Sequence, residues 1–185
     1  MAKSIDFTDY SQNNLDEVGK WIVGSPDAFN WDQYIRTALE LEDTDNTDAA
    51  VVRRKATIRR KITSLARLNI LDSKQILTGK QPYGVVSAVF CTDAITHSVS
   101  EWQSVLKNIT QLVQGNGHLI LVGVFGSSSW SMGSETFKAT DLNKDIIVQT
   151  IEDLGYAIEI FESVLAESDD HGYDGVFFMK ARKKT

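Results

Sequence analysis

The stretch SIDFTDYSQNNL, residues 4–15, decides how the rest of the chain is interpreted. Apolar and polar residues alternate in its first half, which predicts a strand over Ser4–Tyr10. Helix-starting residues follow, and the spacing of the later apolar residues predicts a helix over Gln12–Ile22 with one buried face. A strand that passes directly into a helix is typical of an α/β fold.

Asp9, near the end of the predicted strand, has two interpretations. An acidic side chain at the carboxyl end of a parallel strand is well placed to bind the hydroxyls of a ribose. The same side chain can instead cap the helix that follows. This stretch alone leaves both roles open.

The bulk composition is that of one globular domain covering residues 1–185, with 42% hydrophobic and 24% charged residues. A net charge of −6 argues against a general role in binding nucleic acid or a membrane surface. Cys91 is the single cysteine, so no internal disulfide can form and a reducing compartment is expected. No apolar run approaches the roughly 20 residues of a membrane span, and the first residues do not resemble a secretory signal. We therefore expect a cytoplasmic, monomeric protein.

Strand and helix patterns alternate along the remaining chain. Helices are predicted at about 49–67 after a cap at Asp48, at 101–113, and from a cap at Asp141 to about Leu154. Strands are predicted at 68–71, 83–90, 118–125, 156–164 and 176–183, and the segments 24–31 and 126–137 are interpreted as connections. The continuous apolar run YGVVSAVF at 83–90 is typical of a strand buried on both faces. The order predicts a mostly parallel sheet with an antiparallel finish.

Several common catalytic motifs are absent from the sequence. It contains no G-x-G-x-x-G, no G-x-x-x-x-G-K-[ST], no H-E-x-x-H and no G-x-S-x-G. His97, His118 and His171 lack the spacing of metal ligands, so no metal site is expected. The basic run RRKATIRRK at 53–61 is interpreted as a solvated helix face rather than a polyanion site, because its apolar residues keep helical spacing.

Acidic residues follow three predicted strands. Asp9, Asp72 and Asp93 each come at or just after a strand end, and the carboxyl edge of an open α/β sheet is where ligands bind. One such residue is usually a helix cap, but three at successive strand ends favour a site. An adenosine-type ligand suits it, with a carboxylate for the ribose, a polar group for the adenine edge, and Val89 and Phe90 as apolar walls.

The segment FTDYSQNNLDEVGKWIVGSPDAFNW, residues 7–31, resembles the small-molecule N-methyltransferases, the group with nicotinamide, phenylethanolamine and indolethylamine N-methyltransferase. The shared features are a strand ending in T-D-Y, an Asn five residues after the Asp, a K-W helix end and P-x-A-F-[DN]-W. The likeness continues through VVSAVFCTDAI, LVQGNGHLILVG, SSSWSMGSETF, EDLGYAIEIFE and GVFFMKARK. It implies a Rossmann-like class I fold and methyl transfer from S-adenosylmethionine to a nitrogen of a small amine or pyridine.

On the cofactor side, the resemblance implies roles for five residues. Asp9 matches the family's ribose carboxylate and Asn14 its cofactor-contacting asparagine. Asp72 and Ser73 fall at the adenine-edge pair, where the family usually has Asp followed by Val. Val89 takes the place of a cofactor-contacting residue that is often threonine.

On the acceptor side, Asp93 matches an acidic residue that lines the amine or pyridine pocket. Ser127 and Trp130 match substrate-side positions, and an aromatic residue is common at the second. Gly123 occupies a place where several members carry another pocket acid, which leaves the acceptor's identity open. The resemblance implies no catalytic nucleophile.

The resemblance also implies that the N-terminal part of the family's domain is missing from this sequence. Family members begin with a substrate-covering helical segment and a first strand with a glycine-rich loop, and that strand lies between those that begin here at Ser4 and Tyr83. We therefore expect a partial methyltransferase domain that lacks the N-terminal cap and first strand. The alternative function is a non-catalytic, methyltransferase-like remnant that binds a partner or paralogue by strand addition. A doubly wound oxidoreductase has no glycine fingerprint here to support it.

Overall fold

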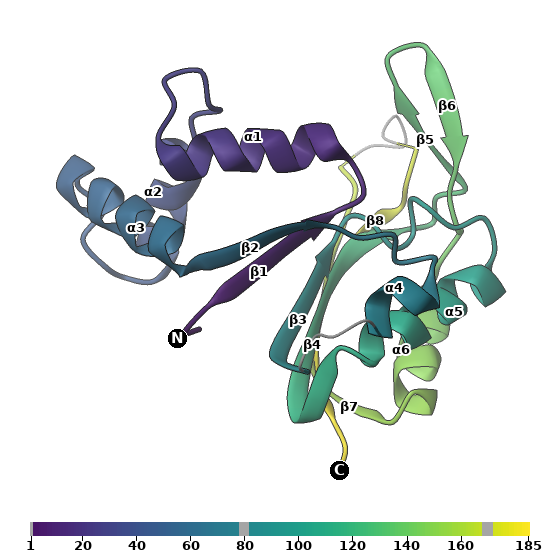
Figure 1. The fold of residues 1–185 in the computed structure, drawn as a ribbon. Coiled ribbons are helices and arrows are strands. Elements are labelled where there is room, and N and C mark those ends of the chain that lie inside the picture. The colour runs from purple at the N-terminus through teal and green to yellow at the C-terminus, as the bar shows by residue number, and fades with distance from the viewer. Residues whose placement is uncertain (1, 78–81, 168–171) are drawn as a thin grey trace. The chain divides into compact units, whose positions relative to one another are not determined.

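The structure, a computed structural model, describes residues 2–77, 82–167 and 172–185 (Figure 1). The chain forms two compact units, Met1–Asn69 and Ile70–Thr185. The interpretation of residues 1–185 as a single domain remains a prediction. Within the described residues, no helix is long and apolar enough to cross a membrane.

The first unit combines a two-stranded parallel sheet with three helices. In chain order its elements are β1 (Ile5–Asp9), α1 (Gln12–Val23), α2 (Asp32–Leu41), α3 (Asp48–Lys61) and β2 (Ile62–Arg67). Ser11 caps α1 by accepting a hydrogen bond from the Asn14 N–H, and Gly24 ends it at φ 74°, a conformation that glycine adopts without strain. Its core consists of Trp21, Ile35, Leu39, Ala50 and Val51.

The predicted helix over 49–67 is wrong at its end, and so is the predicted strand over 68–71. Ile58, Ile62 and Leu65 have helical spacing, but α3 stops at Lys61 and the chain becomes extended at Ile62. Pairing with β1, in which Phe7 lies opposite Leu65, overrides that local pattern.

Two further details of the first unit differ from the predictions. Thr47, not Asp48, caps α3, because its side chain accepts a hydrogen bond from the Ala50 N–H. The helix α2 was not predicted, and its buried residues Ile35 and Leu39 face the core of the unit.

The second unit is a four-stranded sheet with helices and a hairpin. Its elements are α4 (Ser73–Leu77), β3 (Tyr83–Val89), α5 (Val99–Thr110), β4 (Val113–Phe125), β5 (Ser129–Met132), β6 (Glu135–Lys138), α6 (Lys144–Asp153), β7 (Tyr156–Leu165) and β8 (Gly175–Lys183). The sheet order is β3-β4-β8-β7; β3 and β4 are parallel, and β8 is antiparallel to both neighbours. The predicted α/β fold with an antiparallel C-terminal strand is confirmed. Asn143, not Asp141, caps α6.

One face of this sheet packs against α5 and α6 (Figure 1). The buried core is formed by helix residues Trp102, Val105, Leu106, Ile109, Ile147 and Ile151 and by sheet residues Leu119, Leu121, Tyr156, Phe177, Met179 and Ala181, with Val113 and Leu142. The opposite face is partly apolar and solvent-exposed, since Val85, Val89 and Val164 are more than half exposed. It also carries an ion-pair cluster in which Glu159 contacts His118, Lys180 and Arg182. The prediction that 83–90 is buried on both faces is therefore wrong for the described structure.

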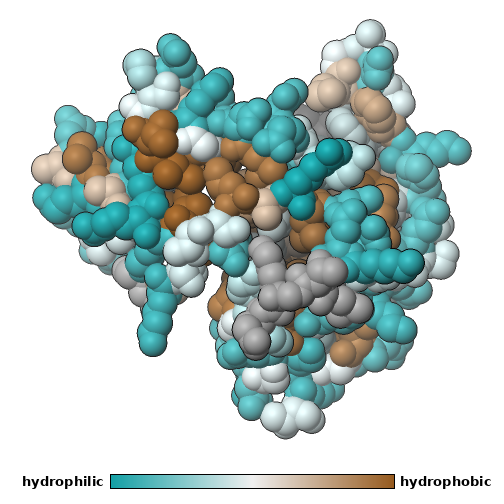
Figure 2. Space-filling view, viewed as in Figure 1, coloured by the Kyte–Doolittle hydropathy of each residue, from teal (hydrophilic) through white to brown (hydrophobic). Residues whose placement is uncertain are grey.

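Apolar residues also reach the surface of the first unit. Val23, Leu41 and Val52 are all more than half exposed. Figure 2 shows hydrophobic residues gathered in parts of a mainly hydrophilic face. Single exposed apolar side chains of this kind are normal in soluble proteins.

A pair of methionines tests where the core lies. Met179 is fully buried, whereas Met132 is 66% exposed. We expect Met179→Ala to lower the free energy of unfolding by about 2–5 kcal/mol, because it removes buried apolar contacts and leaves a cavity. Met132→Ala, the same chemical change at the surface, should cost less than about 0.5 kcal/mol. Urea denaturation measures both, and equal losses would contradict this assignment of the core.

Candidate functional site

Asp93 lies in the loop after β3 and is only 2% exposed. Its Oδ2 atom accepts a hydrogen bond from the Val124 N–H at 3.2 Å, and its backbone oxygen accepts one from the Thr140 N–H at 3.0 Å. Its Oδ1 atom is buried and has no hydrogen-bond partner among the described residues. Burial raises the pKa of the Asp93 carboxyl because desolvation penalises its charged form, while the backbone N–H groups of Val124, Asp93 and Ala94 act in the opposite direction. An unpaired buried oxygen suits a ligand that donates a hydrogen bond.

Gly123 lies beside this carboxyl on β4. A Cβ atom at this position would lie 2.9 Å from Cε1 of Phe177 and 3.0 Å from Oδ1 of Asp93. Phe177 is fully buried and cannot easily move. The side chains of Asp93 and Phe177 therefore occupy the space that an acidic side chain at position 123 would need. Asp93 supplies the one carboxyl at this point of the described structure.

A buried network of hydroxyl groups supports the Asp93 loop. The Thr96 hydroxyl donates to the Thr92 backbone oxygen at 2.8 Å, and it lies 2.7 Å from the Thr140 hydroxyl. The indole N–H of Trp102 donates to the Thr92 hydroxyl at 3.1 Å. Satisfied buried networks hold a unique geometry. The sequence analysis missed it, although threonines on both sides of Asp93 were a visible signal.

The segment interpreted as a connection contains the β5–β6 hairpin, and Trp130 fastens it to the Asp93 loop. Its indole N–H donates to the Ala94 backbone oxygen at 3.0 Å, and its ring stacks on Phe137 at 4.5 Å between centroids. The Ser127 hydroxyl is buried and donates to the Ser129 backbone oxygen at 2.7 Å. Trp130 thus contacts the Asp93 loop, and its role as a substrate-side residue remains a prediction. The sequence analysis missed Phe137, which lies across the hairpin from Trp130.

Val89 and Phe90 close β3, and both are about half exposed. Phe90 has a φ of 49°, a left-handed conformation that is rare for a bulky residue. Its N–H nevertheless donates to the Val122 oxygen at 2.8 Å, so the parallel ladder continues to this point. Backbone strain of this kind gathers at functional sites, and the sequence contains no local signal for it.

Asp72 does not close a strand, because β2 ends at Arg67. Its Oδ1 atom accepts a hydrogen bond from the Lys74 N–H at 3.0 Å and its Oδ2 atom one from the Gln75 side chain at 3.2 Å. These contacts cap α4, whose first residue is the exposed Ser73. The cap role of Asp72 is observed, and the adenine-edge role remains a prediction.

The second unit has a cavity of about 430 Å³, and two of its lining residues are close in sequence to Asp72 and Asp93. Its lining includes Leu71, directly before Asp72, and Ile95, two residues after Asp93, together with His97 and with residues along α5 from Ser100 to Asn108. Asp72, Ser73 and Asp93 do not themselves line the cavity, so it does not link the predicted ligand-binding residues.

Asp9 and Asn14, in the first unit, contact each other. The Asp9 Oδ2 atom accepts a hydrogen bond from the Asn14 side-chain amide at 3.1 Å, and Oδ1 accepts one from the Ser11 N–H at 2.8 Å. Ser11, not Asp9, caps the helix. A carboxylate has about four acceptor positions, so Asp9 can accept further hydrogen bonds from ligand hydroxyls.

No group of three or more His, Cys, Asp or Glu side chains in the described ranges could hold a metal ion. His171 lies outside the described residues.

The sequence model of the NNMT/PNMT/TEMT family matches residues 1–184. Human nicotinamide N-methyltransferase is 25% identical over 185 residues, which cover 98% of this chain and 69% of the relative. The pig enzyme of the same name is 28% identical, with the same coverage. Human phenylethanolamine N-methyltransferase is 23% identical and is covered over 66% of its length. The resemblance stated from the sequence is confirmed.

Solved structures of methyltransferases have a similar fold. A SAM-dependent methyltransferase from Methanosarcina mazei superposes with a TM-score of 0.63 at 12% identity, over 98% of this chain and 82% of that one. A putative S-adenosylmethionine-dependent methyltransferase from Listeria monocytogenes gives 0.62 at 11% identity, over 100% and 82%. The chain thus has the Rossmann-like methyltransferase fold.

The buried carboxyl of Asp93 predicts a pH dependence of stability. Its pKa is raised on folding, so the folded protein binds this proton more tightly than the unfolded chain does, and the wild type loses stability as the pH rises above about 4. Asn stays neutral, so the free energy of unfolding of Asp93→Asn, relative to wild type, should increase from about pH 4 to about pH 7. Urea titrations across this range measure the difference, with surface Asp27→Asn as the control for loss of one carboxyl. A difference that shrinks as the pH rises would contradict the assignment.

Proposed function

This chain belongs to the NNMT/PNMT/TEMT family, and we propose that it is an S-adenosylmethionine-dependent N-methyltransferase for a small amine or pyridine-type acceptor. The names of its relatives, nicotinamide, indolethylamine and phenylethanolamine N-methyltransferase, support this class of acceptor. The single observation that carries the proposal is the buried Asp93 carboxyl, whose Oδ1 atom lacks a partner in a loop fastened by Trp130. We further propose that the protein acts as a cytoplasmic monomer that binds neither nucleic acid nor membranes.

The cofactor supplies a methyl group activated on a sulfonium. Asp9 and Asn14 would hold the ribose, since Asp9 has acceptor positions left after its two observed hydrogen bonds. Asp72 and Ser73 would lie at the adenine edge, with the exposed Val89 as an apolar contact for the ring. These assignments rest on the family resemblance together with the availability of each group.

Asp93, Ser127 and Trp130 would form the acceptor side. The Oδ1 atom of Asp93 would accept a hydrogen bond from the N–H of an amine acceptor or from a substituent N–H of a pyridine-type acceptor, whose ring nitrogen carries no hydrogen. The raised pKa of Asp93 makes its carboxyl more ready to hold a proton. Trp130 offers an aromatic surface, and Ser127 shapes the hairpin's first turn. Methyl transfer is an in-line displacement, so these residues orient the acceptor nitrogen and exclude water, and no nucleophilic side chain is needed.

The edge of β3 favours a second candidate, a non-catalytic protein that binds a partner or paralogue by strand addition. Among the described strands β3 is the edge of the four-stranded sheet and pairs with β4, so its other edge, over Val85–Val89, is open to a further strand. Val85 and Val89 on this strand are exposed. An open apolar edge strand is the usual template for an added strand.

Calorimetric titration with S-adenosylmethionine tests the first candidate. We expect a dissociation constant on the order of micromolar, and a reduction in affinity of about tenfold or more for Asp9→Asn, because charge-assisted hydrogen bonds are lost. The matched control is Asp6→Asn, on the same strand, which should bind like wild type. If the folded chain does not bind S-adenosylmethionine, the proposal is wrong.

Methyl transfer itself is measured with labelled cofactor and a panel of amines and pyridines, on this chain and on a version extended at its N-terminus. Asp93→Asn should raise the KM for the acceptor while leaving cofactor affinity unchanged, because Asp93 is assigned to the acceptor alone. Activity in neither version would remove the enzyme interpretation.

Two proline substitutions test the strand-addition candidate. The Phe90 N–H bonds to β4, and hydrogen bonding alternates along a strand, so the Ser87 N–H points away from β4 and the Ala88 N–H toward it. Ser87→Pro should leave stability within about 1 kcal/mol of wild type but abolish co-purification with a partner, whereas Ala88→Pro should lower stability by roughly 3 kcal/mol. Partner capture that survives Ser87→Pro would argue against strand addition.

A further inference from the structure

The first unit contains a second cavity, of about 400 Å³, that the proposed function does not use. It lies where the C-terminal end of α1, the segment 24–31 and α3 meet. Its polar lining comes from Ser25, Asn30, Asp32, Lys55 and Arg59. Four of these five side chains carry hydrogen-bond donors, and one is a carboxylate.

Arg59 differs from its neighbours on α3. Three other cations of this helix form ion pairs: Arg53 with Asp45, Arg54 with Glu42, and Lys55 with Asp32. Arg59 has no ion pair or hydrogen bond among the described residues, and its Nε atom is buried without a partner. Its guanidinium lies over the Trp21 ring, 4.8 Å from the centroid, which holds the group in place. An oriented, unpaired guanidinium is a ready partner for an anion.

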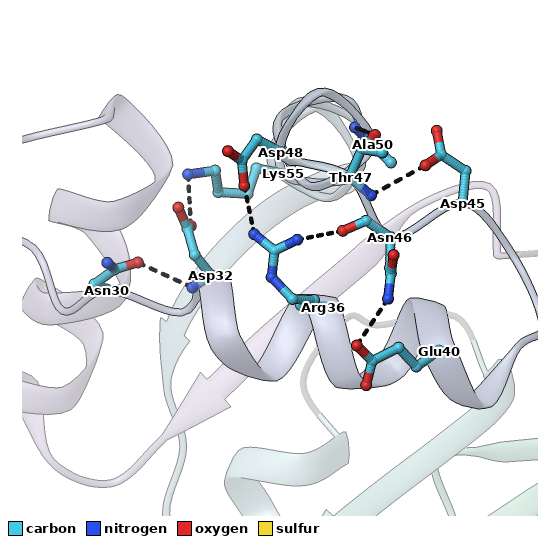
Figure 3. A network of polar contacts seen from close by, with 10 residues as sticks. All are labelled: Asn30, Asp32, Arg36, Glu40, Asp45, Asn46, Thr47, Asp48, Ala50 and Lys55. Atoms are coloured by element: carbon cyan, nitrogen blue, oxygen red, sulfur yellow. Dashed lines mark hydrogen bonds and ion pairs between the residues drawn. The ribbon is translucent and has the colours of Figure 1, made fainter.

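The other donors of the cavity are also available. The Asn30 Oδ1 atom accepts a hydrogen bond from the Asp32 N–H at 2.9 Å, so the amide nitrogen of Asn30 is left to donate elsewhere (Figure 3). Ser25 Oγ accepts a long hydrogen bond of 3.4 Å from the Asp27 N–H, which leaves its O–H unused. Asp32, the carboxylate of the lining, is neutralised by Lys55 at 2.6 Å. Donors are therefore in excess, and the net charge of the lining is positive.

A purely structural role for Arg59 is the competing explanation. Its Nη1 atom lies 3.5 Å from the position of a Cβ on Gly24, so the guanidinium is close to the C-terminal end of α1. A cation there stabilises the helix through its dipole. That role accounts for the location of Arg59, but it does not account for the buried unpartnered Nε or for the additional donors around the cavity.

We propose that this cavity binds an oxyanion, a phosphate or carboxylate group, through the Arg59 guanidinium with Ser25 and Asn30 as further donors. The planar fork of arginine matches two oxygens of either group. The site uses no residue assigned to the cofactor or the acceptor, so its test is independent of methyl transfer. It also revises the interpretation of the run at 53–61, whose charges are solvated or paired except at this position.

The indole N–H signals of the tryptophan side chains can report directly whether an anion binds in this cavity. The chain has four tryptophans: Trp21 and Trp31 line the cavity, and Trp102 and Trp130 belong to the other unit. In a ¹⁵N-labelled protein at constant ionic strength, inorganic phosphate and acetate are titrated separately against the four indole N–H signals. We expect saturable shifts of the Trp21 or Trp31 signal, while those of Trp102 and Trp130 stay in place. The anion that saturates at the lower concentration identifies the group.

Variants on the same helix complete the test. Arg59→Gln should weaken binding at least about tenfold, and the exposed neighbour Arg60→Gln, which removes the same charge outside the cavity, should leave it unchanged. Ser25→Ala, a milder change that serves if Arg59→Gln does not fold, should weaken binding about threefold. Non-saturable shifts, equal shifts of all four signals, or equal loss in Arg59→Gln and Arg60→Gln would overturn the proposal.

Discussion

Burial of one face of the sheet β3-β4-β8-β7 is the constraint on which the second unit depends. Trp102 of α5 is fully buried in this interface, and its indole N–H must find a partner there because an unpaired buried donor is costly. It finds the Thr92 hydroxyl. The side chain that fills the core thus also anchors the loop carrying Asp93, so the packing that stabilises the fold positions the proposed acceptor site.

The same core limits the chemistry of the site. Phe177 projects from β8 against Gly123, and Asp93 takes the remaining space, so no second acid can stand at that position. The one carboxyl keeps an unpaired Oδ1 atom, a feature that costs about 1–3 kcal/mol. No contact within the described structure compensates for this loss of stability. An uncompensated buried acceptor is expected where a ligand completes the hydrogen bonding. If Asp93 lines the proposed acceptor site, its one buried carboxyl is suited to a ligand group that donates a hydrogen bond to Oδ1.

The sequence was informative where local pattern and tertiary packing agree. The helix after residue 11 and the strands at 83–90 and 176–183 follow from apolar spacing, and the structure has them. Prediction failed where the two conflict, as at 62–67, where helical spacing yields to pairing with β1. The contact of Trp130 with Ala94 and the close approach of Asp93 and Phe177 to Gly123 join residues 30 or more positions apart, so no local pattern encodes them. Caps were misplaced by one or two residues because neighbouring Thr, Asn and Asp all suit that role.

Several features of residues 85–93 conflict with what their sequence pattern predicts. The strand in this segment has the composition of a fully buried one, yet Val85 and Val89 are exposed, Phe90 is left-handed, and Asp93 is buried with an unpaired oxygen. Natural sequences are locally consistent with their folds, and the exceptions gather at functional sites. The exposed apolar side chains would be stabilised by contact with an apolar surface, and the unpaired Asp93 oxygen would be stabilised by a hydrogen-bond donor. A ligand or added chain that supplied both would satisfy every one of these groups, and this is the reason for proposing the segment as the functional centre of the second unit.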